Sequence, residues 1–223
     1  ALSRDNEEWK VAQEADWKML SVPDVIEQYL LPGRDSYVVA GTHGKTTTST
    51  ILAHLLNESS LKCNAFLGGI STNFQSNFIR GESDLTVVEA DEFDRSFLQL
   101  NPFASIITST DADHLDIYGS NDHFFDGFKE YVERIDVNGF LVRHSSVRIN
   151  HKNEVTYGLD IPADYRGFNP RFEEGRFFFD LDTPSGCWTE VELGIPGLHN
   201  AENAIACIAL CKGLGLTEDV IRH

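Results

Sequence analysis

The sequence predicts an α/β fold, in which a mostly parallel sheet is flanked by helices and extended by a small antiparallel β-hairpin subsheet. Short apolar runs typical of strands alternate with helical segments from residue 34 to about residue 155. A glycine-rich segment joins the first of these runs to the first long helix, as in a P-loop. Beyond Val155 the pattern changes to alternating apolar and polar residues around a turn at residues 183–186.

The parallel part of the sheet is predicted from five apolar runs. They are Tyr37–Ala40, Asn64–Leu67, Leu85–Val88, Ala104–Thr108 and Phe140–Val142. We expect the second run to end at Gly68-Gly69. The hairpin strands are predicted over Arg176–Asp182 and Cys187–Leu193.

Helical periodicity predicts three long helices. The first spans Thr46–Asn57 and places Ile51, Leu52, Leu55 and Leu56 on one apolar face. The second spans Phe124–Val132. The third spans Ala201–Leu214, and Gly215 is expected to close it.

Residues 1–33 differ from the rest of the chain. Asp5 is placed to cap a short helix over Glu7–Ala15. Ser21, with Asp24 three residues later, predicts a capping box for a second helix, which Pro32-Gly33 ends. We interpret residues 1–33 as the tail of a preceding domain and a linker, and residues 34–223 as one domain.

Composition excludes several classes of partner. Eighteen basic and 35 acidic side chains give a net charge of −17 at pH 7, so we expect no nucleic acid and no anionic membrane surface as a partner. The apolar runs are shorter than the roughly 18 residues of a membrane span, and we see no secretory leader. Cys207 and Cys211 lie one helical turn apart in an apolar stretch, which favours buried free thiols and a reducing cytoplasm.

The strongest motif is the segment between the first strand and the first long helix, Gly41-Thr42-His43-Gly44-Lys45-Thr46-Thr47. Its amides and the helix N-terminus can bind phosphate oxygens, Lys45 can reach the β- and γ-phosphates, and the Thr46 hydroxyl can bind Mg²⁺. Val39 stands where the usual P-loop has its first glycine, so the loop is a shortened variant. The alternative is an ordinary β–α turn.

Acidic residues follow two later strands of the predicted parallel sheet, Leu85–Val88 and Ala104–Thr108. Glu89 is the first acid after Leu85–Val88, and we expect it to face the crevice at the sheet edge as a Mg²⁺ ligand. Asp91, Glu92 and Asp94 come next and can equally form a solvated loop.

One histidine among carboxylates follows the strand after that. His114 lies with Asp111, Asp113 and Asp116 beyond Ala104–Thr108, which predicts a metal or phosphate site. Mg²⁺ fits this set better than zinc, because no second His or Cys stands at zinc-ligand spacing.

The start of the last long helix carries the fourth motif, with His199, Asn200 and Asn203. The two asparagines are three residues apart and share a helix face. Their amides offer a donor and an acceptor to an adenine edge. A plain N-cap is the alternative for this pattern.

Taken in order, the strings GTHGKTTT, VEADEFD, DADHLDIYG and PGLHNAENA resemble the Mur ligase family over residues 34–223. This resemblance implies a three-domain enzyme. Its N-terminal domain binds a UDP-sugar, its central domain binds ATP, and its C-terminal domain, absent here, closes on ATP and the amino acid. The DADHLDIYG string favours the alanine-adding branch, and no counterpart of the carbamylated lysine of sister ligases is identifiable.

The resemblance also implies a reaction and residue roles. ATP and Mg²⁺ would drive the joining of L-alanine to UDP-N-acetylmuramate through an acyl phosphate, in peptidoglycan precursor synthesis. Lys45 and Thr46 would contact phosphates and Mg²⁺, Glu89 would bind Mg²⁺, and His114 would bind a second Mg²⁺. His199, Asn200 and Asn203 would lie by the adenine or the phosphates. An arginine and an aspartate from the C-terminal domain have no counterpart here, so we expect this segment alone to be inactive.

Three alternatives remain at this point. The first is another ligase of the superfamily, a folylpolyglutamate synthase or the murein tripeptide recycling ligase. The second is a non-catalytic ATP-binding module, although Glu89 and His114 as two metal ligands argue against it. The third is a phosphate-switch GTPase, which normally has a longer glycine loop and an Asn-Lys-x-Asp string that this sequence lacks.

Overall fold

The computed structural model describes residues 6–91, 97–111 and 121–222. The strands are β1 (Asp35–Ala40), β2 (Asn64–Ser71), β3 (Ser76–Ile79), β4 (Leu85–Glu89), β5 (Ala104–Ile107), β6 (Phe140–His144), β7 (Glu154–Leu159), β8 (Tyr165–Glu173), β9 (Arg176–Thr183) and β10 (Gly186–Leu193). The helices are α1 (Glu7–Glu14), α2 (Val22–Val25), the π-helix η1 (Ile26–Leu30), α3 (Lys45–Glu58), α5 (Asn121–Val132), α6 (Leu198–Gly213) and α7 (Glu218–Arg222).

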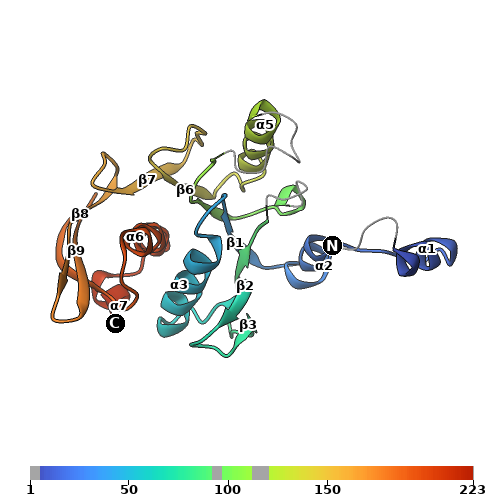
Figure 1. The fold of residues 1–223 in the computed structure, drawn as a ribbon, viewed down its shortest axis with the longest axis horizontal. Helices are drawn as coiled ribbons and strands as arrows, with labels where there is room; N and C mark the ends of the chain where they lie inside the picture. The colour runs from blue at the N-terminus through green and yellow to red at the C-terminus, as the bar shows by residue number, and fades with distance from the viewer. Residues whose placement is uncertain (1–5, 92–96, 112–120, 223) are drawn as a thin grey trace.

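The strands form one mixed sheet in the order β10-β9-β8-β7-β6-β5-β1-β4-β2-β3 (Figure 1). In this sheet order, all neighbouring strands between β8 and β2 pair in parallel. Strand β3 pairs antiparallel at one edge, and β9 and β10 pair antiparallel at the other. The predicted fold class is therefore confirmed, including the hairpin of β9 and β10.

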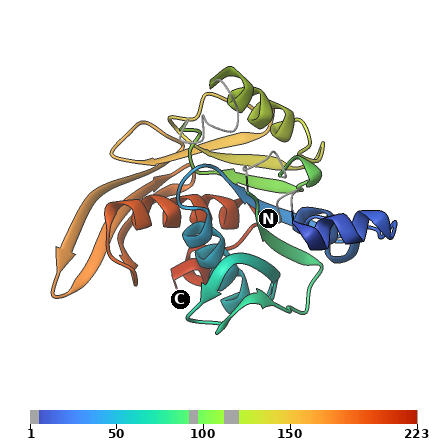
Figure 2. The ribbon, with the colours of Figure 1, turned by 45° about the vertical axis from the view of Figure 1, so that its right-hand side comes forward.

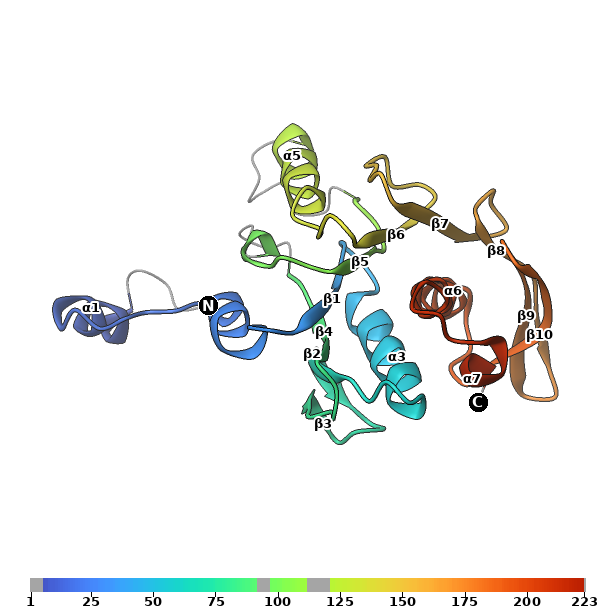
Figure 3. The same ribbon diagram turned by 180° about the vertical axis from the view of Figure 1, so that it is seen from behind.

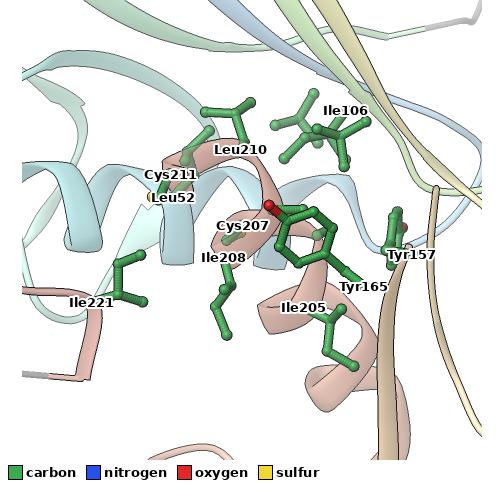
Figure 4. Close-up of a cluster of buried hydrophobic side chains, with 14 of the residues drawn as sticks. Leu52, Ile106, Tyr157, Tyr165, Ile205, Cys207, Ile208, Leu210, Cys211 and Ile221 are labelled. Atoms are coloured by element: carbon green, nitrogen blue, oxygen red, sulfur yellow. The ribbon is translucent and has the colours of Figure 1, made fainter. Parts of the chain in front are cut away.

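Helices α3 and α6 cover one face of the sheet. Figures 1 and 3 both show α6 between α3 and the β8–β9 region, and Figure 2 shows the hairpin strands extending beside it. Ten of the 16 residues of α6 are buried, which is typical of a helix with apolar neighbours on most sides. Leu52 from α3, Cys207 and Leu210 from α6, and Tyr157 from β7 meet in this core (Figure 4).

The opposite face has a second core around α5 and η1. Phe97, Phe128 and Tyr131 pack there on the buried residues of the central strands. Ile26 and Leu31 belong to the same cluster. The segment before residue 34 therefore packs on the domain from Ile26 onward.

Local capping explains the short N-terminal helices. The Ser21 and Asp24 capping box is confirmed, because the Ser21 amide donates to Asp24 Oδ2 at 2.8 Å and the Asp24 amide to Ser21 Oγ at 3.2 Å. The helix beyond it continues as the π-helix η1. Asn6 caps α1 by accepting a hydrogen bond from the Glu8 amide, while Asp5, the expected cap, lies outside the described residues.

Two sequence expectations about element ends are wrong. Gly68-Gly69 does not end the second strand, because β2 runs on to Ser71 and pairs with β3 at Ser76. The last long helix begins at Leu198 rather than Ala201, with Gly197 at its N-cap. Strands β3, β7 and β8 are present without having been expected.

Candidate functional site

The glycine loop lies at the carboxyl edge of the parallel sheet, between β1 and α3. Strands β4 and β5 flank β1 on its two sides. Their last residues, Glu89 and Ile107, therefore end beside the loop. Open α/β sheets bind ligands in the crevice outside this edge.

Hydroxyl groups from the end of β5 hold the loop in shape. Ser109 Oγ lies 2.7 Å from Thr42 Oγ1 and accepts a hydrogen bond from the His43 amide at 3.1 Å. The Thr42 amide donates to the Ser109 carbonyl at 3.2 Å, and Thr108 Oγ1 donates to the Ala40 carbonyl at 3.3 Å. The sequence motifs did not indicate Thr108 and Ser109 as site residues, because their contacts depend on the pairing of β5 with β1.

The loop encloses a small hollow over the N-terminus of α3. The hollow has a volume of about 300 Å³ and is lined by Thr42, Gly44, Lys45, Thr46 and Thr47. Lys45 Nζ donates to the Gly41 carbonyl across the loop at 2.8 Å. Backbone amides, a helix N-terminus and an ammonium group at one place suit a phosphate group.

Gly44 is the point where the loop turns into α3. Its φ of +78° is a left-handed conformation that favours glycine. A Cβ at this position would lie 2.7 Å from Asn203 Oδ1, so the buried side chain of Asn203 packs directly against the loop. The contact brings the start of α6 to the hollow.

Glu89 accepts hydrogen bonds from both neighbouring elements. Thr46 Oγ1 donates to its Oε1 at 2.8 Å, and its Oε2 accepts from the Gly68 amide at 2.7 Å and from Ser49 Oγ at 3.3 Å. A Cβ on Gly68 would collide with the carboxylate, so only glycine allows this approach. Ser49 and Gly68 are further site residues that the sequence motifs did not indicate.

The donor set around Glu89 fits Mg²⁺. A carboxylate and a hydroxyl oxygen, at hydrogen-bond distance from each other beside the glycine loop, are ligands that this ion prefers. Asp91 is exposed two residues further on, and Asp111 is exposed beyond the end of β5. Among the described residues, no three His, Cys, Asp or Glu side chains gather around a metal position.

Several predicted site residues lie outside the described part of the chain. They are Glu92, Asp94, Asp113, His114 and Asp116. The proposed second metal ligand, His114, therefore stays a prediction.

A cleft of about 1780 Å³ opens beside the glycine loop. Lys45, Thr46 and Glu89 form its polar end. Its other walls are mainly apolar side chains of the N-terminal segment, the central strands and the turn at Phe97, among them Trp9, Trp17, Leu20, Ile26, Phe66 and Phe97. A cleft with one polar end and apolar walls can hold a substrate larger than a phosphate group.

The three candidate residues at the start of α6 have different surroundings. His199 is 99% exposed. Asn200 lies inside the first turn, where its Nδ2 donates to the Pro196 carbonyl at 2.9 Å, and Gly197 takes the N-cap position. Asn203 is buried against Gly44, so it is the asparagine that reaches the loop.

The expected burial of Cys207 and Cys211 is confirmed. Cys63, Cys207 and Cys211 are buried free thiols, and Cys187 is exposed. In the described part of the chain, every helix is too short or too polar to cross a membrane.

Comparison with known proteins adds family-level evidence. The sequence profile of the Mur ligase middle domain matches residues 39–211. A UDP-N-acetylmuramate–L-alanine ligase from Porphyromonas gingivalis is 43% identical over the whole chain, which spans half the length of that relative.

Solved structures of similar proteins agree on the fold. The UDP-N-acetylmuramate–alanine ligase MurC from Thermotoga maritima has a TM-score of 0.87 at 26% identity, covering 99% of this chain and 51% of its own. The MurF ligase of Thermotoga maritima, solved in complex with ADP, has a TM-score of 0.73 at 18% identity, covering 92% and 52%.

Proposed function

Because this chain belongs to the Mur ligase family, we propose that it forms the ATP-binding part of a ligase that joins L-alanine to UDP-N-acetylmuramate. The geometric observation that carries the proposal is the hydrogen bond from Thr46 on the glycine loop helix to Glu89. It brings a phosphate-binding loop and a carboxylate metal ligand to one place. The choice of L-alanine and UDP-N-acetylmuramate is supported by the named relative at 43% identity.

Each candidate residue has a proposed role at this site. The loop from Gly41 to Thr47 binds the ATP phosphates, and Lys45 neutralises charge on the β- and γ-phosphate oxygens. Thr46 and Glu89 would hold Mg²⁺, and His114 would hold a second Mg²⁺. Bound Mg²⁺ supplies further charge neutralisation at the phosphates. His199, Asn200 and Asn203 lie along the nucleoside.

The proposed reaction has two balanced steps. A carboxylate oxygen of the muramic acid attacks the γ-phosphorus, ADP leaves, and an acyl phosphate forms. The amine of L-alanine then attacks the carbonyl carbon, the amide bond forms, the bond from this carbon to the phosphate oxygen breaks, and inorganic phosphate and a proton leave. The large cleft beside Lys45 and Glu89 is where the acceptor carboxylate approaches.

The whole protein is proposed to carry out this reaction, because the chain spans about half the length of the curated relatives it matches. Residues 34–223 are the ATP-binding domain, and residues 1–33 connect it to a domain that binds the UDP-sugar. A C-terminal domain completes the closed site, so the segment by itself is inactive. We place the enzyme in the cytoplasm, where peptidoglycan precursors and ATP meet.

Calorimetry on the full-length protein tests the nucleotide site. ATP is titrated with and without Mg²⁺ into the wild type, Lys45→Ala and Lys129→Ala, a matched control on the surface of α5. Loss of charge-assisted hydrogen bonds to phosphate is expected to weaken binding about 10- to 100-fold in Lys45→Ala. Unchanged binding in Lys45→Ala, or equal loss in both variants, would contradict the site.

A substrate panel tests the reaction class. Phosphate release from ATP is expected to require both UDP-N-acetylmuramate and L-alanine, and to stop in excess chelator. Release that instead requires a murein tripeptide, or a folate with glutamate, would assign the protein to another ligase of the superfamily. ATP binding without phosphate release under any of these conditions would indicate a non-catalytic ATP-binding module.

A further inference from the structure

Glu202 is the charged residue of α6 closest in sequence to Asn203, the residue that packs on the glycine loop. We propose that Glu202 is a positioning residue for the nucleotide site, which holds the imidazole of His199 beside Asn203. This inference rests on the proposed ATP site and deepens it. Neither the motifs nor the proposed reaction gives Glu202 a role.

The Glu202 carboxylate lies between two imidazole rings. Its Oε1 is 3.5 Å from His144 Nε2, and its Oε2 is 3.8 Å from His199 Nδ1. The carboxylate is 30% exposed and the His144 side chain 17%, whereas His199 is 99% exposed. One side of the carboxylate therefore faces the protein, and the other faces the exposed ring.

His144 is a fixed anchor for Glu202. Its Nδ1 lies 2.7 Å from Ser146 Oγ and accepts a hydrogen bond from the Ser146 amide at 3.3 Å, and its ring packs edge-on against Tyr157. The neutral ring therefore carries its proton on Nε2, toward Glu202. That nitrogen is buried and has no hydrogen-bond partner among the described residues, and Glu202 Oε1 lies 3.5 Å from it. The interaction with His144 is also the main cause that lowers the pKa of Glu202.

Helix geometry places His199 over both Glu202 and Asn203. On an α-helix, residues three and four positions apart are neighbours on one face. His199 stands three positions before Glu202 and four before Asn203, which touches Gly44. A ring that stays near Glu202 lies on the flank of α6 that carries Asn203, which faces the glycine loop.

Without this contact, an exposed imidazole on the first turn of a helix samples several rotamers. Fixing it only when ATP binds would add a conformational entropy cost to binding. Glu202, held from the protein side by His144, restricts the ring in advance. The expected consequence is tighter nucleotide binding, although Glu202 itself carries a negative charge beside an anionic ligand.

The direction in which one substitution changes ATP affinity separates this positioning role from a purely electrostatic one. Glu202→Gln removes the charge and keeps the shape. If Glu202 positions His199, Mg²⁺·ATP binding to the full-length protein weakens about threefold to tenfold by calorimetry. If Glu202 is merely a nearby negative charge, its neutralisation tightens binding, and the proposal fails.

A double-mutant cycle tests whether Glu202 acts through His199. In the His199→Ala background, Glu202→Gln is expected to have no further effect on ATP affinity, because the ring it positions is gone. Additive losses would overturn the proposal. Glu218→Gln, which removes the charge of a comparable pair with Arg222 on α7, is the control and should bind ATP as the wild type does.

Melting temperatures exclude a merely structural role. Glu202→Gln is expected to change the melting temperature no more than Glu218→Gln does, while only Glu202→Gln weakens ATP binding. A lower melting temperature with unchanged affinity would make Glu202 a structural ion-pair partner and overturn the proposal. A wild-type protein that binds no Mg²⁺·ATP would instead overturn the proposed function, and this inference with it.

Discussion

Asp180 lies on β9, whose pairing with each of its two neighbouring strands is irregular. We expect Asp180→Ala to destabilise the fold strongly. The pairing of β9 with β8 shifts between Phe168 and Arg171, and its pairing with β10 shifts between Trp188 and Val191. Such bulges leave backbone groups out of the regular ladder. The aspartate is 8% exposed and lies at the level of both irregularities.

The magnitude follows from the donors that Asp180 satisfies. Its carboxylate accepts from Asn169 Nδ2 at 2.8 Å, the Glu190 amide at 2.9 Å and Arg171 Nη1 at 3.2 Å. Asn169 and Glu190 have φ of +51° and +55°, so the carboxylate also stabilises two left-handed residues. Hydrogen bonds to a charged group contribute about 1.5–3 kcal/mol each. Arg171 keeps Glu173 at 3.4 Å, so we count only the bonds from Asn169 and Glu190, each at the lower end of that range, and expect a loss of about 3 kcal/mol in total.

Thermal and urea unfolding measure this loss. About 3 kcal/mol corresponds to a melting temperature lower by roughly 6–12 °C in a domain of this size. Asp182→Ala is the matched control on the same strand and face, because its pair with Arg166 is 3.7 Å long and about half exposed. That variant should change stability by roughly 0.5 kcal/mol or less. Equal losses in the two variants would refute the reasoning.

The pH dependence provides a second readout for Asp180. Hydrogen bonds from the Glu190 amide and from Asn169 hold the pKa of Asp180 below its ordinary value of 3.8. At pH values near 3.8, the folded state therefore binds fewer protons than the unfolded state. The stabilisation is present above pH 3.8 and is lost as the pH falls through the lowered pKa. The difference between wild type and Asp180→Asn should be constant from about pH 5 to 8 and shrink below pH 3.8.

Two further predictions concern the site and the core. Gly68→Ala should displace the Glu89 carboxylate and weaken Mg²⁺·ATP binding about tenfold. Gly69→Ala is the control, because a Cβ there makes only an ordinary contact to Thr46, and it should leave the affinity unchanged. Equal affinities of the two variants by calorimetry would count against the Glu89 geometry. Burial raises the pKa of Cys63 to about 12, so a thiol reagent should titrate only the exposed Cys187 in the native protein and all four cysteines in urea. Fast reaction of a second native thiol would refute this.

Sequence patterns predicted the parts of the fold and site that are local. The glycine loop follows directly from the order of strand, glycines, lysine and helix, and Glu89 from its place as the first acid after an apolar run. The hairpin of β9 and β10 shows the alternation of a half-buried sheet. In each case the neighbours in the chain are enough to define the feature.

The missed features depend on which strands become neighbours. Ser109 reaches Thr42 because β5 pairs with β1, and Gly68 reaches Glu89 because β2 pairs with β4. Strand order is not encoded in any single segment, so these contacts have no local pattern. Strands β7 and β8 were missed for a related reason. Gly158 and Gly167 interrupt their apolar runs because Ile161 and Ile205 occupy the space beside them.

The strand order also has a consequence for how the protein folds. The contacts that shape the glycine loop join residues far apart in the chain, with separations of 67 residues for Thr42 and Ser109 and 43 for Thr46 and Glu89. Loops of this length are closed slowly, so contacts of high sequence separation form late relative to local helices.

The hollow at the glycine loop, which we propose binds phosphate, is therefore a property of the completed central sheet. An early species with α3 formed and β5 unpaired would contain the whole glycine loop sequence yet lack the Ser109 and Thr108 contacts that shape it. A ligand of this hollow binds the native state and does not bind the species with β5 unpaired. By mass action it therefore shifts the folding equilibrium toward the native state alone.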